Sequence, residues 1–167
     1  MANWCHNLFT VSGSSHDEVL AFIESTKMLR DGEKCFSLGA LIPCPFDPKS
    51  ANREDLDQWC DENWGCESEA MTEDDFEWNE DGLSATIDFD SLCIPPYRWF
   101  STVGCGHPTL TFDLNFLEIY GGLSGWMHSE NGEYSEEVDP TETIYTVDDS
   151  DGWEERHPPA LAENHSA

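Results

Sequence analysis

The chain has 167 residues and a hydrophobic share of 38%, which suits about one domain with a packed core. Its 35 Asp and Glu against seven Lys and Arg give a formal net charge of −28. The electrostatic field of so much negative charge repels nucleic acid and anionic membranes, which argues strongly against direct DNA or RNA binding. No apolar run approaches the roughly 18 residues of a membrane span, and residues 1–10 lack the features of a signal peptide, so we expect a cytoplasmic protein without membrane contact.

The first quarter of the chain predicts a strand, a helix and a second strand. Weak alternation of apolar residues indicates a strand over 5–12. Ser15 and Glu18 then have the spacing of a capping box, and the apolar residues that follow at helical spacing predict a helix over 16–29. Residues 35–42 are apolar enough to form the second strand.

Prolines and an asparagine mark the next loop and helix. Pro43, Pro45 and Pro48 fix their own φ angles and remove backbone donors, so they predict an extended loop. Asn52 is well placed to cap a helix in which Leu and Trp side chains share one face, and Gly65 is expected to end that helix.

Hairpins and a third helix follow. Residues 76–92 predict a hairpin around an Asp-Gly turn, and the second strand alternates apolar with polar or acidic residues, so one face is expected to be buried. Pro95 and Pro96 open a third helix. Residues 109–120 have a strong period of two, and a later Asn-Gly pair marks a tight turn between two further strands.

The composition also predicts where the domain ends. Beyond residue 138 the chain becomes rich in Pro, Asp and Glu, with one short β-like run at 143–147. We therefore expect one domain over 1–138 and an acidic, partly flexible C-terminal extension over 139–167.

A set of short motifs spread over residues 3–134 carries a resemblance. The motifs are Asn3-Trp4-Cys5-x-Asn7-x-Phe9-x-Val11-x-Gly13, Pro43-x-Pro45, Trp59 followed by Asn63-Trp64-Gly65, Phe89 leading into Pro95-Pro96, Pro108-x-Leu110-x-Phe112, and the stretch 118–125. In content and order they resemble the YubB-like ferredoxin-like domain family of phage and plasmid proteins. The resemblance implies a ferredoxin-like α+β fold, with two or three helices packed on one face of an antiparallel sheet, and a location in the host cytoplasm if the protein is phage-encoded. It implies no activity that can be transferred.

Motifs for catalysis, metals and cofactors are weak or missing from the sequence. The seven cysteines are widely spaced without a C-x-x-C pair, although Cys5-His6 and Cys105 with His107 could in principle converge on a metal. The stretch 148–152 has only a faint likeness to a calcium loop, and no nucleophile, phosphate-binding or zinc-protease motif occurs. We therefore expect no enzymatic activity, no metal site and no cofactor.

The acidic run over residues 54–90 carries the functional hypothesis. It holds fifteen Asp or Glu and no Lys or Arg, which is enough carboxylates to imitate a stretch of nucleic-acid backbone. We therefore expect a binding protein that inhibits a host nucleic-acid-handling defence complex, either a CRISPR effector or a restriction enzyme, by mimicry or by blocking its basic groove. The expected partner-binding residues, with Trp78 as the aromatic anchor, are Glu67, Glu69, Glu73, Asp74, Asp75, Glu77, Trp78, Glu80 and Asp81.

An alternative explains the same charge without a partner. The chain could be a non-catalytic accessory protein of a mobile element whose acidity only keeps it dispersed. The two hypotheses differ in where the acids lie: a mimic should align them on one surface, whereas a protein made acidic for solubility should scatter them over every face.

Overall fold

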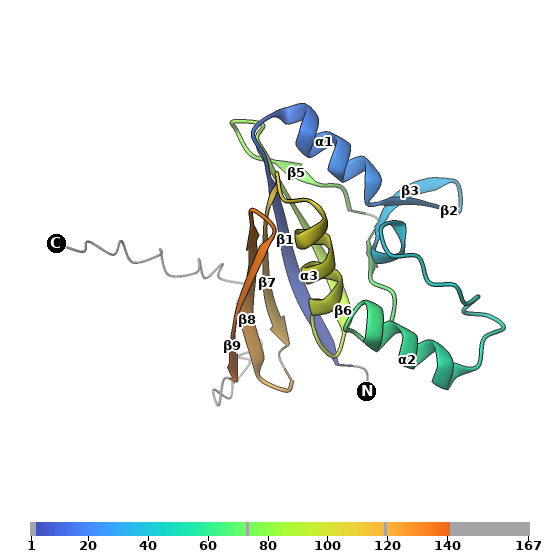
Figure 1. The fold of residues 1–167 in the computed structure, drawn as a ribbon. Coiled ribbons are helices and arrows are strands. Elements are labelled where there is room, and N and C mark those ends of the chain that lie inside the picture. Colours follow the sequence, from blue (N-terminus) through green and yellow to red (C-terminus); the bar gives the residue numbers. More distant parts are fainter. Residues whose placement is uncertain (1–2, 73, 119, 141–167) are drawn as a thin grey trace, which may run out of the picture.

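The computed structural model describes residues 3–72, 74–118 and 120–140, and every structural statement below concerns these residues. Three α-helices, nine strands and one short 3₁₀ helix follow one another along this part of the chain (Figure 1). In order they are β1 Trp4–Ser12, α1 His16–Ser25, β2 Lys27–Arg30, β3 Glu33–Ser37, the 3₁₀ helix Leu38–Ala40, α2 Arg53–Asn63, β4 Met71–Thr72, β5 Glu77–Trp78, β6 Ser84–Leu92, α3 Tyr97–Gly106, β7 Thr111–Glu118, β8 Leu123–Glu130 and β9 Glu133–Pro140.

The strands form two antiparallel sheets. The larger has six strands in the order β5-β6-β1-β7-β8-β9, and the smaller has three in the order β2-β3-β4. The first strand of the chain therefore lies in the interior of the large sheet, paired with β6 on one side and β7 on the other. Because β6 and β7 are joined through α3 and enclose β1, these three strands and α3 make a split β-α-β unit.

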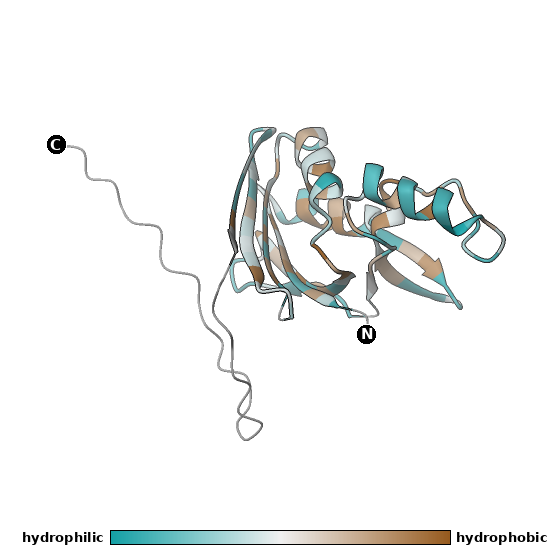
Figure 2. Ribbon diagram, turned by 90° about the horizontal axis from the view of Figure 1, so that it is seen from below, coloured by the Kyte–Doolittle hydropathy of each residue, from teal (hydrophilic) through white to brown (hydrophobic). Residues whose placement is uncertain are grey.

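Helices α1 and α3 lie on the same side of the six-stranded sheet, and the opposite face carries no helix in the described part of the chain (Figures 1 and 2). The core fills the space between this sheet and its helices. At its centre the Phe9 ring stacks on the Phe112 ring at 5.8 Å between centroids and meets the edge of the Trp99 ring at 5.5 Å. The Trp99 indole also donates a hydrogen bond to the Leu38 carbonyl at 3.1 Å, which ties α3 to the 3₁₀ helix.

The capping residues predicted for the first two helices are confirmed. The Ser15 hydroxyl accepts a hydrogen bond from the Glu18 amide at 3.3 Å, and the Asn52 side chain accepts one from the Glu54 amide at 3.3 Å. Each cap satisfies a backbone donor that has no partner within the helix, so local sequence is sufficient to place these starts. The Asn131-Gly132 turn is confirmed as well, with positive φ at both residues, as a tight hairpin turn requires.

Two predicted boundaries are wrong. The helix expected over 16–29 ends at Ser25, because residues 27–30 form β2 and pair with β3. The strand expected over 35–42 ends at Ser37, where the chain turns into the 3₁₀ helix and the Leu38 amide bonds the Ala70 carbonyl. In both places pairing with another segment, the adjacent β3 in the first case and the distant residue Ala70 in the second, decides the structure. Helical spacing and hydrophobicity do not report such pairing.

The fold prediction is confirmed as a mixed α+β fold with a large antiparallel sheet and three helices. The expected domain boundary at 138 lies within β9, which continues to Pro140, while the β-like run at 143–147 and the rest of the predicted extension lie outside the described residues. No helix in the described ranges is long and apolar enough to span a bilayer.

Candidate functional site

The helix-free face of the six-stranded sheet, called the open face below, is built by residues that alternate with the core residues of each strand. In β6, for example, Ile87 and Phe89 are buried while Asp88 and Asp90 are exposed. The strand register then places Asp88 beside Leu8 of β1, and Leu8 beside Asn115 of β7. The open face comprises Trp4, His6, Leu8, Thr10, Glu77, Thr86, Asp88, Asp90, Asp113, Asn115, Leu117, Ser124, Trp126, His128, Glu130, Glu133, Ser135 and Glu137.

Charge on the open face has one sign. None of the six strands of the large sheet, as described, contains a Lys or Arg. Carboxylates project onto the open face from five of these strands. The cations of the described chain lie on other elements: Lys27, Arg30, Lys34, Lys49, Arg53 and Arg98. No Lys or Arg of the sheet itself interrupts these carboxylates, and Arg30 of β2 comes near them only at the edge beside Asp90, so this face presents a negative potential to a partner.

Two histidines hold carboxylates in place on this face. His6 Nδ1 lies 2.5 Å from Asp90 Oδ1 across the β1–β6 pair, and His128 Nδ1 lies 2.7 Å from Asp113 Oδ1 across the β7–β8 pair. Partial burial, followed by repulsion from Asp90, raises the pKa of Asp88 above its usual range. The carboxylates of β6 are thus close enough to affect one another.

Exposed apolar side chains lie among these charges. Trp4, Leu8 and Trp126 are 49%, 44% and 37% exposed, and the Trp126 indole donates a hydrogen bond to Glu137 Oε2 at 3.2 Å. Tryptophan is one of the residues enriched at the energetic centres of protein interfaces, where the surrounding contacts exclude water. The open face therefore combines the acidity and the aromatic anchors that a protein-binding surface needs.

A hollow of about 470 Å³ borders the open face where the two sheets meet. It is lined by Trp4 of β1, Asp90 of β6, Arg30 of β2 and Glu69, which precedes β4. The hollow therefore connects the acidic run predicted from sequence with the carboxylates of the sheet.

The residues predicted from the acidic run do not gather on one surface. Glu67 is exposed and contributes to the raised pKa of the Cys93 thiol after the larger effect of burial, while Glu69 is turned inward. Asp74 is exposed and adds slightly to the raised pKa of Asp88, after burial and the charge of Asp90. Asp75 is exposed and pairs with Lys27 at 2.8 Å, and Glu73 lies outside the described residues.

The remaining four predicted residues belong to the β5–β6 hairpin. Glu77 pairs with Thr86 and faces the open side, whereas Trp78 is half-buried on the helix side, with its ring 4.2 Å from that of His16. Glu80 and Asp81 are exposed in the turn, where Asp81 Oδ1 accepts a hydrogen bond from the Leu83 amide at 2.8 Å. Partner binding by these residues stays a prediction.

Several acids of the open face are not among the predicted site residues. The alternation in 83–90 already indicates that Asp88 and Asp90 share a polar face, and the period of two in 109–120 does the same for Asp113. What the sequence does not show is the strand order that places these acids beside Glu137 and Trp126 of the last two strands.

Cys5 and His6, one of the pairs considered as metal ligands, do not share a face of the sheet. Cys5 and His6 are neighbours in β1 and point to opposite faces of the sheet, and burial raises the pKa of the Cys5 thiol to about 12. Within the described residues, no group of three or more His, Cys, Asp or Glu could hold a metal ion.

Glu69 predicts an unusual dependence of stability on pH. Its Oε1 accepts hydrogen bonds from the Gly39 amide at 3.1 Å and the Ser37 hydroxyl at 3.2 Å, yet burial raises its pKa. Because the folded-state pKa lies above that of the unfolded chain, the folded protein holds this proton more tightly, and stability falls as pH rises through the folded pKa. Asp88, whose pKa is also raised, acts in the same direction.

Glu69→Gln is therefore expected to raise the urea midpoint at about pH 7.5 and to flatten the loss of stability between about pH 5 and pH 7.5. Glutamine keeps an oxygen acceptor for the Gly39 amide without the buried charge. Glu62→Gln on the exposed side of α2 is the control and should leave the pH profile unchanged. Equal profiles for wild type and Glu69→Gln would show that this carboxylate is not the source of the pH dependence.

Comparison with known proteins gives no match: no family model, no curated protein and no solved structure is similar to this chain.

Proposed function

We propose that this chain is an acidic inhibitor that docks its open face against the basic nucleic-acid-binding groove of a host defence complex. The observation that carries the proposal is that none of the six sheet strands, as described, contains a Lys or Arg while their open side carries carboxylates. A groove built to hold phosphates is lined with Lys and Arg, so its complement is a surface of carboxylates without cations.

The geometry of a sheet suits such mimicry. Neighbouring strands lie about 4.8 Å apart, and residues on the same face of a strand repeat about every 6.6 Å, so carboxylates can be placed at regular short intervals. Asp88 of β6, Asp113 of β7 and Glu137 of β9 occupy three strands of the face. Trp4 and Trp126 would add the buried contact area that charges alone do not supply.

The nature of the target rests on the resemblance of the chain to YubB-like ferredoxin-like proteins of phages and plasmids. We propose that the chain also has the ferredoxin-like fold of that family. The split β-α-β unit of β6, α3 and β7 around β1 supports this proposal, since a ferredoxin-like fold contains such units. Proteins of phages and plasmids benefit from disabling host defences. The proposed target is therefore a CRISPR effector complex or a restriction enzyme, and the proposed activity is binding without catalysis in the host cytoplasm.

A second function is favoured by the helix α2. Asp57, Asp61 and Glu62 are exposed on this helix, away from the open face, so acids are not confined to one surface. An accessory protein whose charge only maintains dispersion would show such scattering. If the charge only maintains dispersion, two variants with the same net charge should behave alike, whichever carboxylates they change.

Two matched charge reversals separate these functions. The open-face variant combines Asp88→Lys, Asp113→Lys and Glu137→Lys, and the helix variant combines Asp57→Lys, Asp61→Lys and Glu62→Lys, so both change the net charge equally. Release of fluorescent DNA from a panel of purified CRISPR effectors and restriction enzymes measures inhibition. We expect the open-face variant to lose about a hundredfold in affinity and the helix variant to stay within about threefold.

Salt and folding complete the test. Wild-type inhibition should weaken steeply as salt rises, because exposed charges are screened over about 8 Å at physiological ionic strength. Circular dichroism should show the same fold for both variants. Equal loss in both variants would contradict a specific surface, and failure of the wild type to release DNA from any complex in the panel would refute inhibition.

A further inference from the structure

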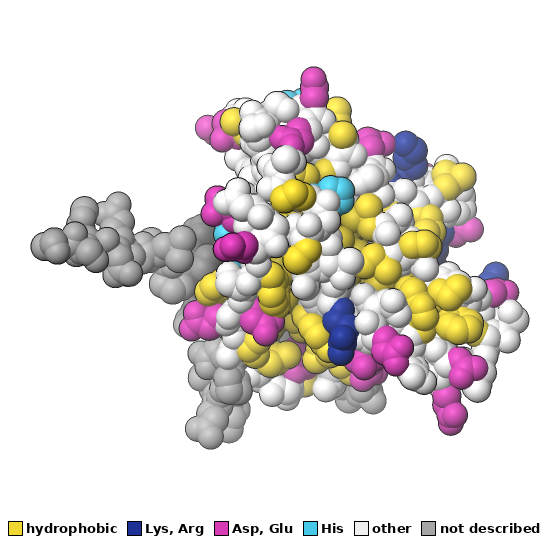
Figure 3. All heavy atoms as spheres, viewed as in Figure 1, with side chains coloured by type: hydrophobic (Ala, Val, Ile, Leu, Met, Phe, Trp, Pro, Cys, Tyr) yellow, Lys and Arg dark blue, Asp and Glu magenta, His cyan; other side chains and the backbone are white. Residues whose placement is uncertain are grey.

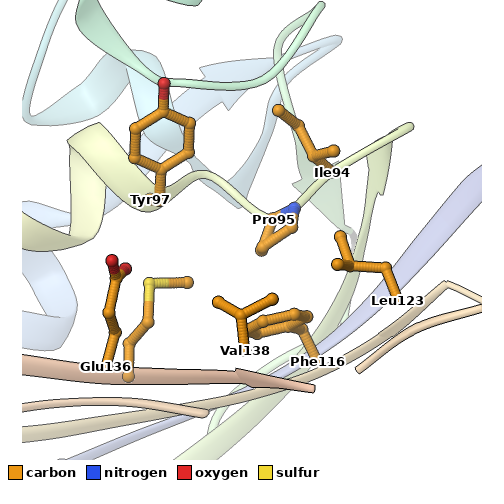
Figure 4. A pocket seen from close by; sticks show the side chains of 8 residues that line it. Ile94, Pro95, Tyr97, Phe116, Leu123, Glu136 and Val138 are labelled. Carbon is orange, nitrogen blue, oxygen red and sulfur yellow. The ribbon is translucent and has the colours of Figure 1, made fainter. Parts of the chain in front are cut away.

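The helix-bearing side of the sheet contains an apolar pocket of about 240 Å³ beside the last strand. Pro95 and Tyr97 at the start of α3 form one wall, and Phe116, Leu123 and Val138 of three successive strands form the other (Figure 4). Apolar side chains gather on this side of the molecule, between α3 and strands β8 and β9 (Figure 3). The pocket lies on the opposite side of the sheet from the open face.

A glycine lies beneath one wall of the pocket. Gly125 pairs with Val138 on the inner side of β8, between Leu123 and Met127. A Cβ at Gly125 would overlap the Glu137 carbonyl oxygen and lie 2.7 Å from the Phe116 ring, so this ring packs closely over the glycine and forms part of the pocket wall. The volume is below the roughly 300–1,000 Å³ of sites for drug-sized ligands, and it suits a single bulky side chain of a partner.

One carboxylate lies at the mouth of this pocket. Glu136 lines the pocket with its carboxylate turned toward the side of the Tyr97 ring (Figure 4). This carboxylate accepts a hydrogen bond from the Tyr134 hydroxyl. Glu133 and Glu137 lie on the same strand, and β7, β8 and β9 contain no Lys or Arg. Arg98 of α3 lies by the other wall, with its Nε 3.2 Å from the Tyr97 hydroxyl, so a cation would meet net negative charge on the β9 side of the pocket.

Strand β9 also ends the sheet. In the described chain its outer side pairs with no other strand, so its backbone groups there can accept an added strand. A second copy of this chain is a poor occupant, because pairing β9 with β9 would place Glu133, Glu136 and Glu137 against the same acids. Charge complementarity selects a basic segment instead.

We propose that an extended segment of a partner protein adds to the outer edge of β9, with a bulky apolar side chain in the pocket and a neighbouring Lys or Arg at Glu136. The backbone pairing supplies general affinity, and the pocket with its carboxylate selects the sequence. This surface is independent of the open face, so it goes beyond the proposed function.

The probe is a phage-displayed library of random twelve-residue peptides, selected on the full chain. We expect selection of peptides with an aromatic or large aliphatic residue next to Lys or Arg. A selected peptide, made synthetically and followed by fluorescence anisotropy, should bind about tenfold more weakly to Glu136→Lys and to Val138→Ser. Val138 is 48% exposed, so Val138→Ser should fold normally.

Matched variants decide where the peptide binds. Glu62→Lys makes the same charge change on the exposed side of α2, outside the pocket and the open face, and should alter affinity by less than about twofold. Amide shifts in NMR spectra should concentrate on β9. Selection of no peptide, selection without basic residues, loss of affinity only in the open-face variant, or pairing of two copies of the chain would each overturn the proposal.

Discussion

Trp99→Ala is expected to lower the free energy of unfolding by about 3–5 kcal/mol, because truncating a fully buried aromatic residue removes its burial and leaves a cavity. The Trp99 side chain is 0% exposed, and its ring meets the edges of the Phe9 and Phe36 rings at 5.5 and 6.0 Å between centroids. The change also leaves the Leu38 carbonyl without its indole donor. Since small domains are stable by only about 5–15 kcal/mol, the variant should lose a large part of its stability, as urea denaturation would show.

Two tryptophan variants serve as controls for that prediction. Trp99→Phe keeps an aromatic ring and loses mainly the hydrogen bond, so we expect a loss of about 1–2 kcal/mol. Trp126→Ala removes an indole that is 37% exposed on the open face and should cost less than about 1 kcal/mol. Similar urea midpoints for Trp99→Ala and Trp126→Ala would show that Trp99 does not anchor the core.

Gly104→Ala is expected to destabilise the fold by about 1–3 kcal/mol, since added atoms in a close-packed contact force the neighbouring elements apart. Gly104 lies in α3 and faces β8, where a Cβ would come within 2.6 Å of the Ser129 Cβ. Alanine is normally favoured over glycine in a helix by about 1 kcal/mol, so a loss of stability would isolate the steric effect. Thermal unfolding followed by circular dichroism measures it.

The opposing residue provides a rescue. Ser129→Gly removes the side chain that the added methyl group would meet, so Gly104→Ala combined with Ser129→Gly should be more stable than the sum of the two single effects predicts. Ser129→Ala removes the Oγ, which an added Cβ at Gly104 would also meet, but keeps the Cβ at 2.6 Å, so it should give a smaller rescue than Ser129→Gly. Ser129→Ala alone should be nearly neutral or stabilising, because the Ser129 hydroxyl is buried without a hydrogen-bond partner in the described structure. Additive effects in the double variant would contradict direct contact.

Local signals in the sequence are enough to predict the parts of the fold that depend on a few neighbouring residues. Ser15 and Asn52 satisfy the first amides of α1 and α2, and Asn131 with Gly132 adopts the positive φ angles of a tight turn. Hairpin β2–β3 escapes prediction because Lys27–Arg30 continues the helical pattern of α1 and becomes a strand only through its pairing with β3.

In the candidate site, too, features of a single strand can be predicted from the sequence, whereas features that depend on strand pairing cannot. Alternation along residues 83–90 indicates a polar face with Asp88 and Asp90, which is a property of a single strand. The acidic run suggests one surface, yet Glu69 turns inward and Trp78 faces the helix side. Continuity of charge along the chain does not give continuity in space, because the direction of each side chain depends on strand pairing.

The place of β1 in the sheet also affects how the chain is synthesised. The ribosome makes β1 before both of the strands that pair with it, and the second of them, β7, is complete only at Glu118. At about 5–20 residues per second, the nascent β1 waits roughly 5–20 s before both of its edges can be paired. During that interval the apolar side of β1, with Phe9 and Val11, has no complete sheet to join. Overproduction is therefore expected to depend on chaperone capacity, and slower translation should not increase the yield of folded protein.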